Sequence, residues 1–268
     1  MRPRRAGRAT SQRRLRAWAS PGSAVSSPGK RNPVLLADEP AHAGEAPPAR
    51  SLHSGLNAEM DGAELLAVVR AELAPVERGL VDHHYLAELE TGRVPPESLR
   101  AFAGEQRAII TSDRRSFEHL AQRFPLPPAG DFFQDLAAGE EEALRLLARF
   151  GTAVGLDADY EPLAGCQAYP AYVAWLALNG SPADVALAFL ANLESWGRSC
   201  ARMRDALRGV YGADAVAFFD FFAEPPAGFE ERALALAATG DPASARRAAR
   251  LLQAYELLYW NTLADDLH

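Results

Sequence analysis

The sequence predicts an all-α fold, a single bundle of seven or eight helices. From Met60 onward, apolar residues recur every three or four positions, which is the spacing of one face of a helix. Proline and small polar residues stand where these periodic stretches begin, and glycine stands where several of them end. The alternating pattern of a β-strand is almost absent. Short loops and the lack of an internal repeat indicate one domain over residues 60–268.

The first three helical stretches lie in the N-terminal half of this domain. Residues 62–92 predict either one helix kinked at Pro75 or two helices, with Gly92 in the left-handed position that follows a helix C-terminus. Residues 95–124 begin with proline and an acid in the first turn, as helix N-termini commonly do. Residues 131–155 give the third stretch.

Two later stretches are interrupted by proline. Residues 166–180 predict a helix with Pro170 in its first turn. Residues 214–240 predict two shorter helices, because the Pro225-Pro226 pair cannot continue a helix.

The two stretches with the strongest start signals are long and lie in the C-terminal half. Residues 181–212 begin with Ser181 as a natural N-cap and Pro182 in the first helical position. Residues 241–267 begin in the same way, with Asp241 as the N-cap and a proline behind it.

Residues 1–59 differ from the rest in composition and charge. They hold ten basic and four acidic residues, net +6, which leaves 18 Arg against 31 Asp and Glu, net −13, for residues 60–268. Arg, Pro, Gly and Ser dominate this basic extension, so it is predicted to be disordered. A transit peptide, a nucleic-acid-binding arm and an upstream extension with no folded role all fit. The last is favoured because helical periodicity begins at Met60.

Composition argues against several classes of protein. Two cysteines, Cys166 and Cys200, do not make a disulfide framework, so a reduced, cytoplasmic setting is expected. No run of about 18 apolar residues occurs, so no membrane span is expected. The acidic domain would repel DNA phosphates, so we expect no nucleic-acid partner.

Glu256 falls on the apolar face of the last helix. It lies four residues after Leu252 and three before Tyr259, so its carboxylate points along the buried face. Burying a carboxylate is costly unless the group is paired or hydrogen-bonded. Two interpretations stay open: an acid at the core edge that pairs with an arginine, and an acid in a pocket.

Two other stretches pose the same question. Glu194 is either a pocket acid or a helix-edge acid paired with Arg198, four residues on. Glu105 and Gln106 follow Phe102 by three and four residues, so at least one of them should face inward. The alternative is a surface Glu105 beside a Gln106 that hydrogen-bonds at the core edge.

Aromatic residues and histidines complete the set of candidates. Tyr172 and Trp175 share a helix face, as plain core or as the wall of a pocket. The histidines of the folded part do not form the Glu-x-x-His pairs of carboxylate-bridged di-iron bundles, so no metal site and no cofactor is predicted. The sequence shows no Ser-His-Asp or Cys-His pattern of nucleophilic catalysis.

Five stretches resemble, in chain order, the motifs of the TenA/thiaminase II family. That family opens with H-P-F-x-x-x-L-x-x-G, which HHYLAELETGRVPPESLRAF resembles. The family's next four motifs are A-Y-x-x-Y-L, P-C-x-W-x-Y, W-I-x-x-Y and E-x-x-F-W-x-x-A. The stretches similar to them, in the same order, are AYVAWL, ALAFLANLESWG, FFDFFAEPPAGFEE and YELLYWNTL. Together the matches cover residues 62–266. The resemblance implies a heme oxygenase-like bundle, which the family shares with pyrroloquinoline-quinone synthase and some di-iron oxidases.

The resemblance also implies roles for single residues. Glu256 matches the family's catalytic Glu, which faces a pocket for an aminopyrimidine, and Tyr172 matches a pocket tyrosine. Four positions depart from the family pattern, where Gln106 replaces the substrate-binding Asp, Asn192 the nucleophilic Cys, and Trp196 and Phe222 two tyrosines. Asparagine cannot supply a nucleophile, and Cys200 lies two turns further along the same helix. The chain thus resembles a divergent member without the family Cys and Asp.

The implied pocket is aromatic with few polar groups, which suits a small heteroaromatic ligand. Around Glu256 as acid/base, the expected lining is Gln106, Glu105, Tyr172, Trp175, Asn192, Glu194, Trp196, Phe222 and Tyr259. Three functions are carried as hypotheses: a TenA-like hydrolase or transferase acting on a thiamine- or aminopyrimidine-related molecule, a catalytically silent ligand-binding or regulatory protein, and a metal-dependent oxidase. The resemblance further implies a homo-oligomer.

Overall fold

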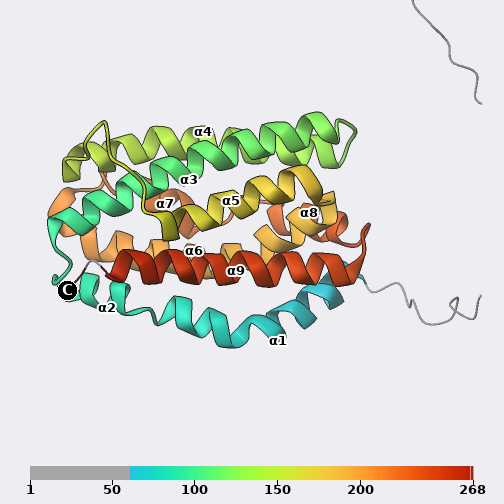
Figure 1. Ribbon diagram of the computed structural model, residues 1–268, viewed down its shortest axis with the longest axis horizontal. Helices are drawn as coiled ribbons and strands as arrows, with labels where there is room; N and C mark the ends of the chain where they lie inside the picture. The colour runs from blue at the N-terminus through green and yellow to red at the C-terminus, as the bar shows by residue number, and fades with distance from the viewer. Residues whose placement is uncertain (1–60, 266, 268) are drawn as a thin grey trace, which may run out of the picture. The chain divides into compact units, whose positions relative to one another are not determined.

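The computed structural model describes residues 61–265 and 267, so the extension predicted over residues 1–59 lies outside the described residues. The described part consists of helices and loops without a strand, as predicted (Figure 1). None of these helices combines the length and apolar character needed to cross a membrane. The helices are α1 (Gly62–Val81), α2 (His84–Glu90), α3 (Pro96–Arg123), α4 (Ala129–Val154), α5 (Ala164–Asn179), α6 (Pro182–Tyr211), α7 (Ala217–Ala223), α8 (Phe229–Ala237) and α9 (Pro242–Asp265).

The predicted start and stop signals act as helix boundaries. At the start of α6, the Ser181 hydroxyl accepts the Asp184 N–H at 3.2 Å, and the Asp184 carboxylate accepts the Ser181 N–H at 2.7 Å, which is a capping box. Asp241 accepts two backbone N–H groups from the first turn of α9, at 3.2 and 3.1 Å. Gly92 follows α2 with φ +70°, the left-handed conformation predicted there.

Two boundaries differ from the expectation. Pro75 lies inside α1, and the chain breaks instead at Asp82 and His83, where the His83 ring accepts a backbone N–H and opens α2. The next difference is at α5, which begins at Ala164, so Pro170 lies in its interior rather than in its first turn. The residues just before the periodic stretch adopt helical conformation too, and this extends the helix toward its N-terminus.

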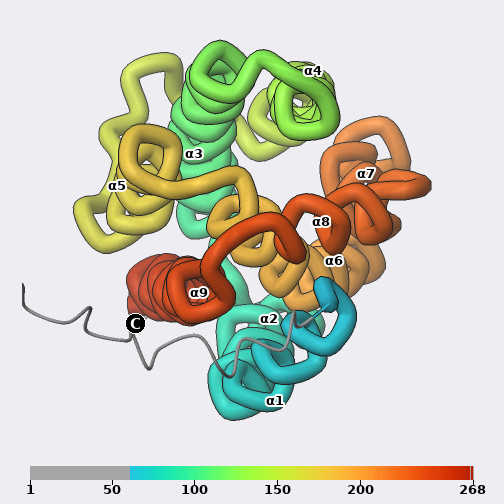
Figure 2. Tube along the Cα trace, turned by 90° about the vertical axis from the view of Figure 1, so that its right-hand side faces the viewer, coloured from blue at the N-terminus to red at the C-terminus, as the bar shows by residue number. Residues whose placement is uncertain are grey.

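The helices surround a common centre, as the end-on view in Figure 2 shows. The α3–α4 hairpin lies on one side of the bundle, and α1 and α2 lie on the opposite side. Helices α5, α6 and α9 lie between these two sides, with α9 packed against both α5 and α6. The short helices α7 and α8 both pack on α6.

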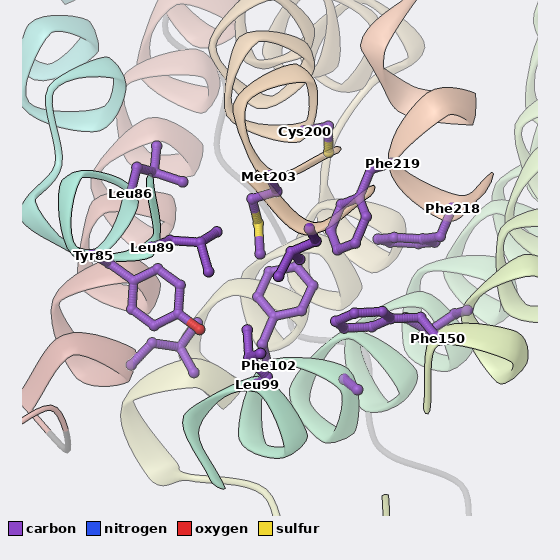
Figure 3. Close-up of a cluster of buried hydrophobic side chains, with 14 of the residues drawn as sticks. Tyr85, Leu86, Leu89, Leu99, Phe102, Phe150, Cys200, Met203, Phe218 and Phe219 are labelled. Carbon is purple, nitrogen blue, oxygen red and sulfur yellow. The ribbon is translucent and has the colours of Figure 1, made fainter. Parts of the chain in front are cut away.

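Two clusters of buried apolar side chains fill the bundle. Figure 3 shows part of the first, in which the rings of Phe102, Phe150 and Phe219 contact one another with centroids 5.0 to 6.3 Å apart. The second contains Phe117 and Phe132, together with aliphatic residues from α1, α5, α6 and α9. Apolar burial on this scale is the main stabilising contribution to a helical bundle.

The two clusters follow each other along the same helices. On α9, Leu252 belongs to the second cluster and Tyr259 to the first, with Glu256 between them. On α3, Phe102 belongs to the first cluster and Phe117 to the second, and polar residues stand between them. The centre of the bundle, where the clusters meet, is therefore the level at which polar side chains are buried.

Candidate ligand-binding and catalytic site

A cavity of about 150 Å³ lies at this central level, walled by α3, α4, α5, α6 and α9 and by the segment from α7 to α8. Most of its lining is aromatic or aliphatic, which suits a small organic ligand. The apolar lining residues are Ile109, Ile110, Leu136, Phe189, Leu193, Trp196, Phe221, Phe222 and Phe229. The polar lining residues are Gln106, Asp113, Asp135, Glu140, Tyr169, Asn192, Glu224, Glu256 and Tyr259.

Glu256 lines the cavity from α9 and is 3% exposed. The Asn192 side-chain N–H donates to Glu256 Oε2, and the Trp260 indole N–H donates to Oε1 at 3.4 Å. Burial raises the pKa of Glu256 to about 8, although these two hydrogen bonds act in the opposite direction. A carboxyl group with this pKa can both give and take a proton near neutral pH.

Gln106 and Tyr259 form a second polar contact on the cavity wall. The Gln106 side-chain amide donates to the Tyr259 hydroxyl over 2.8 Å. Burial raises the pKa of Tyr259 well above its ordinary value, so the hydroxyl stays protonated and remains a donor. The pair therefore presents neutral hydrogen-bonding groups to the cavity.

Of the residues that the structure describes, no cysteine lines the cavity. Asn192 occupies the lining position on α6 where the resemblance places a cysteine. Cys200 is fully buried in the first core cluster, and burial raises the pKa of its thiol well above the ordinary value. The negative charge of Glu256 raises that pKa further. Cys200 is thus held as a protonated thiol, which is a poor nucleophile.

Trp196 and Phe222 both line the cavity, where the resemblance places tyrosines. Their rings meet edge to face, with centroids 5.9 Å apart and planes at 73°. The centroid of the Trp196 ring also lies 6.1 Å from that of Trp260, whose indole N–H donates to Glu256. This wall therefore offers flat apolar surface in place of two hydroxyl groups.

The structure places Tyr172 and Trp175 outside the cavity. Their rings stack on each other with centroids 5.8 Å apart, and Trp175 is 53% exposed. Tyr172 also contacts Tyr255 of α9, at 5.1 Å between ring centroids. The tyrosine of α5 that lines the cavity is Tyr169, three residues earlier. Three residues rotate the side-chain direction by about 60° on a helix, which separates the two positions.

Glu194 is also outside the cavity, on the surface. It forms an ion pair with Arg198 one turn further along α6 and another with Arg70 of α1 at 3.4 Å. The interpretation of Glu194 as a helix-edge acid is therefore confirmed. Exposed pairs of this kind contribute little to stability.

Glu105 is fully buried, but it points away from the cavity. Its carboxylate accepts hydrogen bonds from the Tyr160 hydroxyl at 2.8 Å, the Leu163 N–H at 2.5 Å and the Gln167 amide at 3.3 Å. Burial raises its pKa despite these three bonds. Glu105 thus fastens the loop between α4 and α5 to α3. Of the adjacent pair on α3, Gln106 is the residue that reaches the cavity.

Five polar cavity residues were not predicted: Asp113, Asp135, Glu140, Tyr169 and Glu224. Asp113 follows Gln106 by seven residues, a spacing that puts both on one helix face, so it could have been found from Gln106. Glu140 belongs to a run of three glutamates, and nothing in that run marks which one turns inward. Among the described residues, no group of three or more His, Cys, Asp or Glu side chains is arranged to hold a metal ion.

Solved structures of similar fold agree with this architecture. A TenA homologue from Pseudomonas syringae pv. tomato matches with a TM-score of 0.67 at 13% identity, over 77% of this chain and 96% of its own. A TenA homologue from Pyrococcus furiosus matches with a TM-score of 0.62 at 15% identity, over 74% and 99%. A domain with a heme oxygenase-like fold from Shewanella denitrificans matches with a TM-score of 0.63 at 14% identity, over 75% and 91%.

At these identities the structural matches establish the heme oxygenase-like fold. A comparison with curated proteins gave no match. The sequence itself matches the TENA/THI-4/PQQC family over residues 70–264, which is most of the domain. The chain therefore belongs to the TENA/THI-4/PQQC family.

Proposed function

We propose that this chain binds a small, flat nitrogen heteroaromatic molecule, an aminopyrimidine or a thiamine-related compound, and that Glu256 is its acid/base. The observation that carries the proposal is the position of the Glu256 carboxyl group. It is buried at the wall of a largely apolar cavity, with a pKa raised to about 8. Perturbed carboxyl groups in apolar clefts are typical of acid/base sites.

The cavity walls support a flat ligand. Trp196 and Phe222 offer ring faces and edges, and the Gln106–Tyr259 pair offers neutral donors and acceptors. A ring nitrogen or exocyclic amine can hydrogen-bond with these groups while the ring packs on the aromatic wall.

The chemistry proposed for Glu256 is proton transfer. Asn192 beside it has no nucleophilic atom, and the Cys200 thiol is held protonated away from the cavity. A water molecule activated by Glu256 can attack an electrophilic carbon of the ligand, after which the protonated Glu256 returns the proton to the leaving nitrogen. A hydrolysis of this kind consumes water and needs no enzyme nucleophile.

A catalytically silent binding protein is the second candidate. The observation that favours it is Asn192, because the Asn192 N–H already occupies one carboxylate oxygen of Glu256. In this case the cavity would retain ligand binding and lose turnover.

The experiment that tests both uses the full chain, with thermal shift and product formation measured for thiamine and for aminopyrimidine derivatives. Glu256→Gln is the test variant. Glu142→Gln is the matched control, since Glu142 is exposed on α4 and bonds Arg145 at 2.7 Å. Turnover that Glu256→Gln abolishes and Glu142→Gln retains supports the enzyme. Binding without turnover supports the silent protein. The absence of both would refute this ligand class.

A further inference from the structure

The cavity contains a second pair of acids, Asp113 from α3 and Glu140 from α4. Neither residue is at a position for which the family motifs give a role. Among the described residues that line the cavity there is no Lys, Arg or His. The interior of the cavity is therefore acidic as well as aromatic.

Asp113 has an unsatisfied oxygen. The residue is 3% exposed, and within the described structure its Oδ1 has no hydrogen-bond partner. A buried carboxylate oxygen without a donor is energetically costly, so such atoms are normally paired. An unpaired oxygen on a cavity-lining acid indicates that the missing donor comes from a ligand.

The raised pKa values of the two acids also favour a positively charged ligand group. Burial raises the pKa of Asp113 well above its ordinary value, and the negative charge of Glu140 raises it further. Burial also raises the pKa of Glu140. Both carboxyl groups are therefore harder to ionise than ordinary acids, and a cation bound beside them would favour their ionised forms.

Tyr169 interacts electrostatically both with this pair and with Glu256. Its pKa is raised well above the ordinary value by burial, and then by the negative charges of Asp113, Glu256 and Glu140. All three acids line the same cavity as Tyr169. A ligand that fills this cavity can therefore contact both Glu256 and the Asp113–Glu140 pair.

We infer that Asp113 and Glu140 form a subsite for a cationic nitrogen, such as a primary ammonium or an amidinium group, on the same ligand that contacts Glu256. The inference rests on the proposed function for the ring part of that ligand. An ammonium group supplies three N–H donors, enough for Asp113 Oδ1 and for a Glu140 oxygen. Its positive charge favours the ionised forms of both acids, so binding should release protons to solvent.

The ionisable groups on the other elements around the cavity also favour a cation beside the pair. The other ionisable side chains facing the cavity are Tyr169 of α5, Glu256 and Tyr259 of α9, Asp135 of α4 and Glu224 after α7. Asp135 is balanced by Arg232 of α8, at 2.6 Å, outside the lining. The lining residues of α6 and α8 are uncharged. An anionic ligand would meet only like charge here.

The test measures affinity and proton release by calorimetry on the full chain, in two buffers of different ionisation enthalpy. The probes are a 4-aminopyrimidine with a 5-aminomethyl group and the same ring with a 5-hydroxymethyl group, which differ in charge but hardly in shape. We expect the aminomethyl compound to bind at least about tenfold more tightly than the hydroxymethyl compound, and to release protons on binding near pH 7. Asp113→Asn and Glu140→Gln should each remove this preference and leave hydroxymethyl binding within about threefold.

Glu142→Gln, on the outer face of α4, is the control that should keep the preference. Asparagine and glutamine keep the shape of the two acids and cannot ionise, so both test variants should fold with an unchanged or higher Tm. Equal binding of the two probes, unchanged by Asp113→Asn, would overturn the subsite while the proposed function stands.

Benzylamine and benzyl alcohol separate the remaining cases. If the pyrimidines fail to bind but benzylamine binds in an Asp113-dependent way, the subsite stands and the proposed ligand class falls. If neither amine binds, the subsite is overturned.

Discussion

Asn192 on α6 donates its side-chain N–H to Glu256 on α9, across the centre of the bundle. By resemblance, Glu256 matches the family's catalytic Glu, and Asn192 is one of the four positions that depart from the family pattern. A cysteine at position 192 would offer a nucleophile beside the acid. The asparagine instead stabilises the ionised form of Glu256 and limits the rise in its pKa. With asparagine at this position, the chemistry that we propose for the site is proton transfer and binding, without a covalent step.

The raised pKa of Glu256 predicts a stability that falls as pH rises. Its folded-state pKa is about 8, against 4.5 for the ordinary group. The folded state therefore holds the proton more tightly than the unfolded state, and the resulting stabilisation is complete below the lower value and lost as pH rises through the upper one. Glutamine cannot titrate. Between about pH 5 and about pH 9, the free energy of unfolding of the wild-type chain should therefore fall, relative to that of Glu256→Gln, by on the order of a few kcal/mol.

Urea unfolding of both proteins at several pH values measures this difference. Glu142→Gln, a change on the exposed side of α4, should follow the wild-type curve. A wild-type minus Glu256→Gln difference that stays flat with pH would show that the carboxyl group titrates normally.

Removing the Asn192 amide should destabilise the bundle. Asn192→Ala leaves Glu256 Oε2 without its donor inside the protein, at a cost of about 1–3 kcal/mol. The pKa of Glu256 should rise further, so any pH profile of activity governed by Glu256 moves to higher pH. Asn179→Ala is the matched control, because Asn179 bonds the Trp175 carbonyl at the exposed end of α5. It should change the free energy of unfolding by less than about 0.5 kcal/mol.

The sequence predicts the fold more completely than the site, for physical reasons. Helical periodicity and end signals such as Ser181 and Asp241 are local, so they determine the helices without knowledge of the packing. Glu256 and Gln106 could be found because each breaks an apolar face. Glu140 could not, because which of three adjacent glutamates turns inward depends on how α4 packs against α3. The choice of Tyr169 over Tyr172 likewise depends on the rotation of α5.

Gly104 on α3 should not tolerate a side chain. A Cβ at this position would lie 2.2 Å from Cδ1 of Tyr160, whose hydroxyl is fixed by Glu105. Gly104→Ala should therefore displace the loop between α4 and α5 and destabilise the protein by about 1–3 kcal/mol. Gly209 on α6 has no atom within 4 Å of a built Cβ, so Gly209→Ala should stabilise the helix by about 0.5–1 kcal/mol. Denaturant midpoints that move equally for both variants would contradict the close contact at Gly104.

Tyr169 and Tyr172 provide a direct test of the cavity against the family-based assignment. Tyr169 lines the cavity together with Asp113, Glu140 and Glu256, whereas Tyr172 stacks on Trp175 outside the cavity. Removing a hydroxyl that bonds a ligand should weaken binding about five- to tenfold. Tyr169→Phe should therefore reduce affinity for an aminopyrimidine, and Tyr172→Phe should leave it within about twofold. Both changes keep the ring, so similar Tm values are expected, and calorimetry reports binding alone. The reverse order, with Tyr172→Phe the more damaging variant, would mean that the ligand occupies the α5–α9 edge near Tyr255 and that the central cavity is not the site.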